Sequence, residues 1–316
     1  NPLMALSPDE VERYARHIVM PEVGGPGQAK LVNAKVLVIG AGGLGAPALL
    51  YLAAAGIGTI GICDNDTVSL SNLQRQVVHT TAAVGEPKTK SAKATLVAIN
   101  PHPKIIEHRQ RLDASNALDI IRQYDIVADG CDNFPTRFLV SDACYFANKP
   151  LVSAAVGQFD GQISTFKPYE KAPSGEPLPT YRCFIGELPE RGLFPACEEV
   201  GILGALPGIV GSMQAMEVIK EILGIGDSLA GRLVMYDALA TRFYETRLSW
   251  NPENPLTGRK PSIMSRASMP LAATPAISSC GHNPARRALR CFASNGSSSA
   301  MIAFMAYLRP AGSSSP

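Results

Sequence analysis

Cysteine is sparse in this sequence and follows no disulfide pattern. Seven cysteines are scattered through 316 residues, whereas disulfide-stabilised secreted domains are short and dense in cysteine. The opening segment, NPLMALSPDEVERYARH, contains acidic residues and lacks the apolar centre of a secretory signal. These two absences favour a protein of the reducing cytoplasm.

Acidic residues are absent from the end of the chain. Residues 254–316 contain seven Lys and Arg and no Asp or Glu, whereas residues 1–253 contain 22 basic and 27 acidic residues. From about residue 259 onward Ser, Ala, Pro and Arg dominate, and no helical or strand period persists. We therefore expect residues 1–258 to form the folded domain and residues 259–316 to form a basic Ser/Ala/Pro-rich tail, disordered or non-native.

Two stretches raise the question of a nucleic-acid or membrane partner. The tail has a charge of +7, but its basic residues are dispersed and are not interleaved with aromatic side chains. Residues 36–63 form an uncharged run of 28 residues, which is long enough to span a membrane. Seven of those residues are Gly, and the pattern changes period twice, which excludes a span. We expect no nucleic-acid and no membrane partner.

The same uncharged run predicts half of a mononucleotide-binding fold. A β-branched apolar segment over residues 36–39 stops at a glycine turn, an Ala- and Leu-rich segment follows, and a second apolar segment closes on Asp64. This order indicates strand, turn, helix and strand. The turn has GxGxxG spacing, which lets backbone N–H groups approach a phosphate. Its glycines are Gly40, Gly42, Gly43 and Gly45.

The first 258 residues as a whole predict an α/β fold, in which this Rossmann-like mononucleotide-binding half continues into a mixed, partly antiparallel sheet. A capping box of Ser7 and Glu10 predicts a helix over residues 7–19. Proline, glycine and charge over about residues 167–197 predict a long crossover loop. Further strands are predicted near residues 104–110, 125–128, 151–156, 162–166 and 232–250, and a further helix over residues 206–223.

Polar side chains follow the predicted strands at the edge where open α/β sheets bind their ligands. Asp64 ends the second strand, and Asp132 and Asn133 follow the strand near residues 125–128. Arg75 lies in a polar loop. Lys88 lies in the first turn of a predicted helix, where a cation opposes the helix dipole, so we expect an anionic partner for it.

Cations and carboxylates without a general base suit one type of reaction. The five His are isolated in the sequence, and no Ser/His/Asp set stands out. A carboxylate that attacks the α-phosphate of ATP is already ionised at neutral pH, so it needs no base. The site must supply alignment, charge neutralisation and a metal ion that draws off pyrophosphate. The cations fit this chemistry better than they fit hydride transfer.

Four segments, GAGGLG, DNDTVSLSNLQRQ, VGEPKTKSA and DGCDN, closely resemble in order and spacing the MoeB/ThiF/HesA family. These adenylyltransferases activate ubiquitin-like sulfur carrier proteins and are related to ubiquitin-activating enzymes. The resemblance extends from about residue 7 to about residue 258. It implies ATP and Mg²⁺, a carrier protein ending in Gly-Gly that becomes an acyl-adenylate, and a homodimer. Molybdenum cofactor, thiamine and related sulfur-transfer pathways use such enzymes.

The resemblance also assigns roles to residues. Asp132 would hold magnesium, Arg75 and Lys88 would neutralise the triphosphate, and Arg16 would reach across the dimer into the partner's site. Charge patterning alone would place Arg16 on a solvated helix face. The family's nucleotide contacts, together with the glycine turn, fall on Gly40, Gly42, Gly43, Gly45, Asp64, Asp66, Ser71, Asn72, Leu73, Gln74, Arg75, Lys88, Asp132 and Asn133. For Asp66 and Asn72, capping of the loop is the alternative.

Two matches to the family carry open questions. Cys197 matches the position at which some relatives form a thioester or persulfide-linked intermediate, although a free cysteine is more often an inert small hydrophobe. Many relatives bind structural zinc through two CxxC pairs, which here span Thr180 to Cys183 and Asn254 to Thr257. One cysteine of the four remains, so we expect no structural zinc.

Two other functions remain open from the sequence alone. An NAD-dependent oxidoreductase would use the same glycine turn, with Asp64 on the ribose. An inactive scaffold would bind a ubiquitin-like protein without turnover, which the lost zinc ligands and the unusual tail motivate.

Overall fold

The core of the computed structural model, which describes residues 6–186 and 201–265, is an eight-stranded sheet. Its spatial order is β3-β2-β1-β4-β5-β6-β7-β8. The pairs from β3 to β5 are parallel and those from β5 to β8 are antiparallel, which confirms the predicted mixed sheet. The strands are β1 (Lys35–Ile39), β2 (Thr59–Cys63), β3 (Lys104–His108), β4 (Ile126–Asp129), β5 (Leu151–Val156), β6 (Asp160–Phe166), β7 (Arg232–Asp237) and β8 (Arg242–Arg247).

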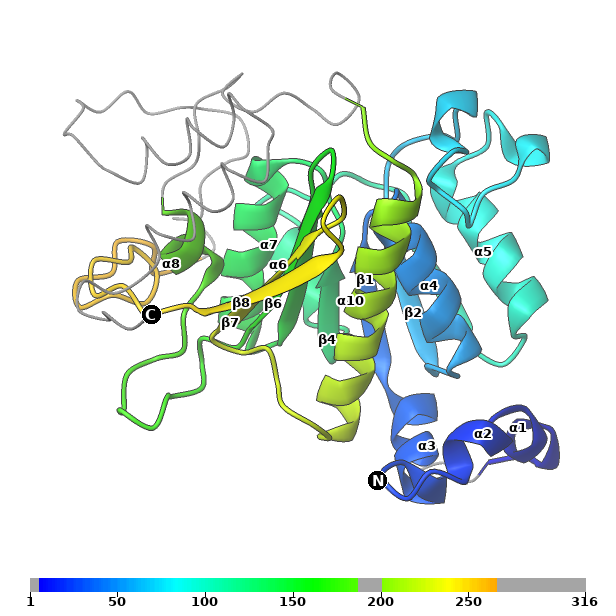
Figure 1. Ribbon diagram of the computed structural model, residues 1–316, viewed down its shortest axis with the longest axis horizontal. Helices are drawn as coiled ribbons and strands as arrows, with labels where there is room; N and C mark the ends of the chain where they lie inside the picture. The colour runs from blue at the N-terminus through cyan, green and yellow to red at the C-terminus, as the bar shows by residue number, and fades with distance from the viewer. Residues whose placement is uncertain (1–5, 187–200, 266–316) are drawn as a thin grey trace.

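Helices cover both faces of the sheet (Figure 1). One face packs against α3 (Gly24–Asn33), α4 (Gly45–Ala54), α5 (Lys88–Ile99) and α10 (Ala205–Leu223). The other packs against α6 (Ala117–Ile121), α7 (Phe134–Ala147) and α8 (Tyr181–Ile185). Alternate side chains of β1 enter the two cores: Val36 and Val38 enter the first, and Leu37 and Ile39 the second. Burial on both faces explains the unbroken apolar runs of the parallel strands.

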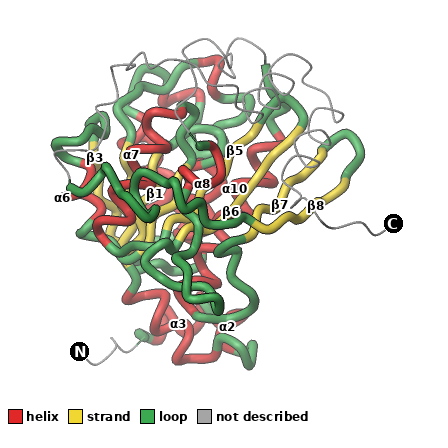
Figure 2. Tube along the Cα trace, turned by 90° about the vertical axis from the view of Figure 1, so that its left-hand side faces the viewer, coloured by secondary structure: helices red, strands yellow, loops and turns green. Residues whose placement is uncertain are grey.

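The N-terminal segment forms two short helices where the sequence predicts one helix over residues 7–19. α1 (Pro8–Arg13) begins with the predicted capping box, and α2 (Ala15–Ile18) follows it. Between them Tyr14 is buried, and its hydroxyl accepts a hydrogen bond from Asn100 Nδ2 at 2.9 Å. This contact with the residue that ends α5 draws Tyr14 inward and interrupts the helix. α2 and α3 lie together beyond the end of the sheet (Figure 2).

Other segments also differ from the prediction. α8 lies inside the predicted crossover loop, of which residues 187–197 are outside the described residues. The helices α3, α6 and α7 and two short 3₁₀ turns, η1 (Leu70–Asn72) and η2 (Thr81–Ala83), were not predicted. Of the predicted tail, residues 259–265 are described, and Ile263 packs in the second core. The rest of the tail lies outside the described residues.

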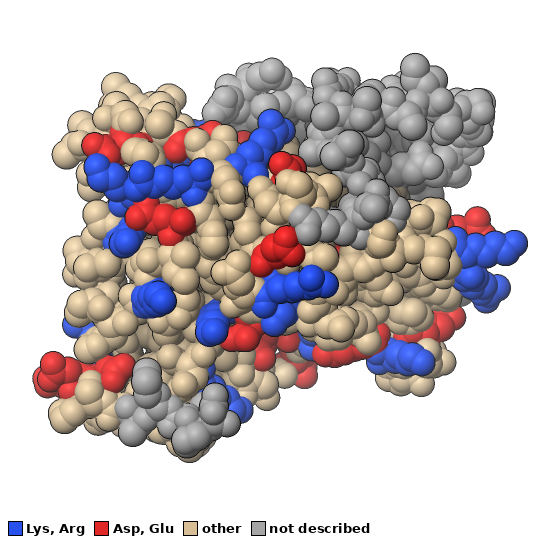
Figure 3. Space-filling view, turned by 180° about the vertical axis from the view of Figure 1, so that it is seen from behind, with Lys and Arg blue, Asp and Glu red and all other residues tan. Residues whose placement is uncertain are grey.

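The surface of the described residues carries charges of both signs. On the face turned away in Figure 1, basic and acidic side chains are interspersed over a largely uncharged surface (Figure 3). Among the described helices, none combines the length and apolar character that a membrane span requires.

Candidate functional site

The glycine turn between β1 and α4 has a backbone geometry that only glycine permits at two positions. Gly40 has a φ of 86°. A Cβ on Gly45 would lie 1.8 Å from the carbonyl oxygen of Gly40, so α4 begins directly against the turn. The N–H of Gly130, the residue after β4, donates to Ile39 O at 3.0 Å. The carboxyl ends of β1 and β4 therefore meet at this turn.

Hydrogen bonds connect the turn to α5 through two carboxylates. Asp64 Oδ2 accepts from the N–H of Ala41, and Asp64 Oδ1 accepts from the N–H of Asp66, both at 2.8 Å. Asp66 Oδ2 accepts from Lys88 Nζ at 3.0 Å. Lys88 is the first residue of α5 and is 7% exposed. Asp66 is thus the anion that this cation requires, and the structure brings Asp64, Asp66 and Lys88 together.

The polar loop from Ser71 to Arg75 lies beside the same turn. Arg75 Nη1 donates to Ser71 O at 3.2 Å, and Arg75 Cδ lies 3.6 Å from the place that a Cβ of Gly43 would take. Asn72 is buried, and its Oδ1 accepts from the N–H of Ser69 at 3.1 Å, so the loop-capping contact is present. Between these residues Leu73 is half-buried and Gln74 is exposed.

Asp132 and Asn133 are exposed in the loop after β4. Asn133 Nδ2 donates to Asp132 Oδ1 at 3.3 Å, and Asn133 Oδ1 caps α7 by accepting from the N–H of Thr136 at 3.0 Å. An accessible carboxylate suits Mg²⁺, which takes one or two protein carboxylates together with phosphate oxygens. Residues 6–186 and 201–265 contain no cluster of three or more His, Cys, Asp or Glu that would hold a metal ion unaided.

A buried ion pair beneath this loop was not foreseen from the sequence. Asp129 Oδ2 lies 3.4 Å from Arg137 Nη1 and accepts from Ser153 Oγ at 3.1 Å. Arg137 also donates to the carbonyl oxygens of Ala154, at 2.7 Å, and Cys131. The pair anchors the backbone just before Asp132 and Asn133. The groups that form this ion pair and its hydrogen bonds come from β4, α7 and β5, so no local spacing in the sequence predicts it.

His79 is a second residue that sequence reasoning missed. It is 6% exposed, and its ring lies between the glycine turn and α5, with Ala41 on one side and Ser91 on the other. Burial lowers the pKa of the His79 imidazole, which favours its neutral form.

Arg16 and Cys197 are not brought to this site within the described chain. Arg16 is exposed on α2, which packs against α3, and α3 leads into the amino end of β1. Arg16 therefore lies at the edge of the sheet opposite to the turn. Cys197 lies outside the described residues.

The four positions that match the two CxxC pairs of the zinc-binding relatives, Thr180, Cys183, Asn254 and Thr257, come together in space. Asn254 is buried, and its Nδ2 donates to Thr180 Oγ1 at 2.8 Å and to Cys183 Sγ at 2.9 Å. Its Oδ1 accepts from the N–H of Thr257 at 3.2 Å. Hydrogen bonds through Asn254 thus join α8 to the segment that follows β8.

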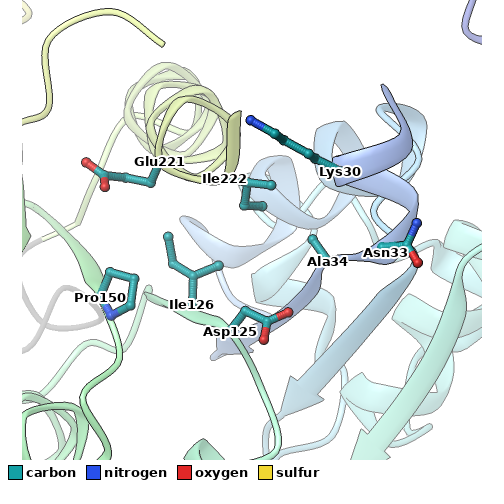
Figure 4. A pocket seen from close by; sticks show the side chains of 8 residues that line it. All are labelled: Lys30, Asn33, Ala34, Asp125, Ile126, Pro150, Glu221 and Ile222. Carbon is teal, nitrogen blue, oxygen red and sulfur yellow. The ribbon is translucent and has the colours of Figure 1, made fainter. Parts of the chain in front are cut away.

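A cleft of about 310 Å³ opens elsewhere, between α3, the end of α10 and the amino ends of β4 and β5 (Figure 4). It lies at the edge opposite to the glycine turn, and none of the predicted site residues lines it. Its lining residues are Lys30, Asn33, Ala34, Asp125, Ile126, Pro150, Glu221 and Ile222.

Comparisons with known proteins agree with the sequence resemblance. The chain is 46% identical over 259 residues to the sulfur carrier protein adenylyltransferase of Thermus thermophilus, which covers 82% of this chain and 95% of that protein. It is 50% identical over 254 residues to the probable adenylyltransferase/sulfurtransferase MoeZ of Mycobacterium tuberculosis. That alignment covers 80% of this chain but 64% of MoeZ, so the chain spans less than two thirds of that protein.

Solved structures agree on the fold. The crystal structure of E. coli MccB with ATP superposes with a TM-score of 0.65 at 22% identity, covering 78% of this chain and 74% of MccB. PaaA superposes with a TM-score of 0.63 at 21% identity, covering 77% of this chain and 75% of PaaA. The sequence model of the ThiF family matches residues 14–256. The chain therefore belongs to the ThiF family.

Proposed function

We propose that this protein catalyses the ATP-dependent adenylylation of the C-terminal glycine of a ubiquitin-like sulfur carrier protein. The observation that carries the proposal is the 46% identity to a sulfur carrier protein adenylyltransferase along 95% of that protein's length. An NAD-dependent oxidoreductase and an inactive scaffold find no support among the relatives. We place the protein in the cytoplasm, with which its four free cysteines among the described residues are compatible.

In the proposed reaction, the carrier's terminal carboxylate attacks the α-phosphorus of ATP. A bond forms between the carboxylate oxygen and phosphorus, the bond to the bridging oxygen breaks, and pyrophosphate leaves with that oxygen. The carboxylate is ionised at neutral pH, so no general base is needed. N–H groups of the glycine turn, together with Lys88 and Arg75, would balance the triphosphate charge. Each oxygen of Asp64 accepts one backbone hydrogen bond and keeps a lone pair for a ribose hydroxyl.

Mg²⁺ would sit at Asp132, whose exposed carboxylate stands at the same strand edge as the turn. The ion would supply charge neutralisation for the departing pyrophosphate. The buried Arg137–Asp129 pair holds the backbone that presents Asp132, and Asn133 keeps that loop attached to the start of α7.

We propose a homodimer in which Arg16 serves the partner's site. Tyr51 of α4 and Ile209 and Met216 of α10 are large exposed apolar side chains on two helices that pack together, a surface suited to a second copy. Mixing inactive Arg16→Ala and Lys88→Ala proteins tests this arrangement. Mixed dimers contain one site with both cations, so activity should return on mixing. Two variants that stay inactive after subunit exchange would contradict the shared site.

The proposed reaction is tested by its product. Purified protein, ATP and a Gly-Gly-terminated carrier should yield the carrier with AMP on its terminal carboxylate, detected by mass spectrometry, together with pyrophosphate. A carrier that lacks the last two glycines is the control. Testing carriers of the molybdenum cofactor and thiamine pathways in turn assigns the pathway. ATP hydrolysis at a rate that no carrier changes, without any adenylylated carrier, would contradict the proposal.

A further inference from the structure

Ala41, within the glycine turn, has a buried backbone that belongs to no helix or strand. Its N–H donates to Asp64 Oδ2 at 2.8 Å. Its carbonyl oxygen lies 2.9 Å from His79 Nε2. Because a buried carbonyl needs a donor and the turn offers no ladder partner, the contact with His79 satisfies an otherwise unpaired group.

The chemistry of the contacts fixes the tautomer of His79. A carbonyl oxygen only accepts, so Nε2 carries the proton and donates to Ala41 O. Nδ1 is then the acceptor, and it receives the hydroxyl hydrogen of Ser91 across 2.9 Å. Ser91 lies one turn after Lys88 in α5. The neutral ring thus connects the glycine turn directly to the helix that begins with Lys88.

We propose that His79 is a positioning residue for ATP: it fixes the distance between the glycine turn and α5, and hence between the turn's N–H groups and the Lys88 ammonium. This inference rests on the proposed function, in which both groups bind the triphosphate. Asp64 and Asp66 form a second connection between the same elements, through Ala41 N–H and Lys88 Nζ. Asp64 binds the N–H of Ala41 and His79 binds its carbonyl oxygen, so hydrogen bonds fix both backbone polar groups of this residue.

Three variants separate this role from general stability. His79→Phe keeps an aromatic ring and removes both hydrogen bonds. His79→Gln keeps a side-chain N–H that can reach Ala41 O. Thr95→Val is the matched control: Thr95 Oγ1 donates to Val78 O at 2.7 Å, so it joins α5 to the residue next to His79 without touching the glycine turn.

KM values for ATP and for the carrier are measured by pyrophosphate exchange, and the affinities for ATP and adenosine by calorimetry. His79→Phe should raise the KM for ATP about tenfold, the effect expected from loss of the buried hydrogen bond that holds the glycine turn at Ala41 O. The KM for the carrier and the affinity for adenosine should stay within about twofold, since neither involves the triphosphate. His79→Gln should recover most of the loss, and Thr95→Val should leave the KM for ATP unchanged.

Three results would overturn the inference: an unchanged KM for ATP in His79→Phe, an equal rise in Thr95→Val, or a parallel loss of carrier and adenosine binding. If His79→Phe does not fold, Ser91→Ala replaces it, because it removes the connection on the α5 side. Wild-type protein that neither binds ATP nor exchanges pyrophosphate would refute the proposed function instead, so the two failures are distinguishable.

Discussion

Replacing Lys88 with Met should slow the proposed reaction strongly while it changes the free energy of unfolding little. The Lys88 side chain is 8% exposed, so an unbranched apolar replacement fills the same space. Its partner Asp66 is 62% exposed and remains hydrated when the charge is lost, so the pair contributes about 0.2–1 kcal/mol to the free energy of unfolding. Removing one group that stabilises transition-state charge costs about 2.7–4 kcal/mol, or about 10²–10³ in rate. Lys88→Met should therefore fold normally and exchange pyrophosphate about 10²–10³ times more slowly.

Lys90→Met is the matched control for this variant. Lys90 lies in the same helix and also pairs with a carboxylate, Glu86, at 2.6 Å, but both members of this pair are exposed. Urea unfolding and carrier-dependent exchange are measured for both variants. Wild-type exchange in Lys88→Met, or an equal loss in Lys90→Met, would refute the assignment of Lys88 to the triphosphate.

Four further perturbations have definite expected outcomes. Gly45→Ala places a Cβ 1.8 Å from Gly40 O and should lower the free energy of unfolding by about 1–3 kcal/mol or more, whereas Gly208→Ala in α10 meets no atom within 4 Å and should not. Burial lowers the pKa of His79 in the folded protein, so on acidification His79 is protonated at a higher pH in the unfolded chain than in the folded protein. The contribution of His79 to the free energy of unfolding is therefore complete above about pH 6.5 and decreases below that pH. The His79→Gln protein should not show this decrease. Chelators should leave the melting temperature unchanged. Asn254→Ala should lower the free energy of unfolding by about 1–3 kcal/mol, because it removes four hydrogen bonds, including those that satisfy the N–H groups of Leu256 and Thr257.

Contradicting results are equally definite. A fully stable Gly45→Ala protein would mean that the turn is not built as described. A pH profile that is identical in wild type and His79→Gln would mean that this ring stays solvated. Metal analysis that finds one zinc per chain would overturn the expectation of a metal-free junction at Asn254.

Local signals in the sequence were sufficient for the strands of the parallel half of the sheet, but not for all of the helices that connect them. The run over residues 36–39, the glycine spacing and the acids at the ends of β2 and β4 are encoded within short segments, and the structure places the run in β1 and the glycines and acids at the carboxyl edge of the parallel strands or at the turn beside it. α7 was missed although its signals are local: Asn133 is an N-cap, and proline follows within the first turn. DGCDN was interpreted as a strand end, and the helix start that overlaps it was overlooked.

Contacts between distant segments limited the prediction of the site. An anionic partner for Lys88 was expected, but its identity as Asp66 depends on a contact across 22 residues. His79 and Arg137 were missed because their principal acceptors are backbone carbonyl oxygens, which have no signature in the sequence. Tyr14 interrupts a helix with a good capping box because its ring is buried against another segment. Such tertiary contacts override local propensity.

The central claim is tested most directly by exchange of labelled pyrophosphate into ATP, with wild-type protein and Arg75→Ala, in the presence and absence of a Gly-Gly-terminated carrier. Arg75 lies beside Gly43 at the turn and has no role in either core cluster. Adenylyl transfer predicts that label enters ATP only when the carrier is present, and that Arg75→Ala loses this exchange while remaining folded. Tight ATP binding without exchange for any carrier would contradict the claim.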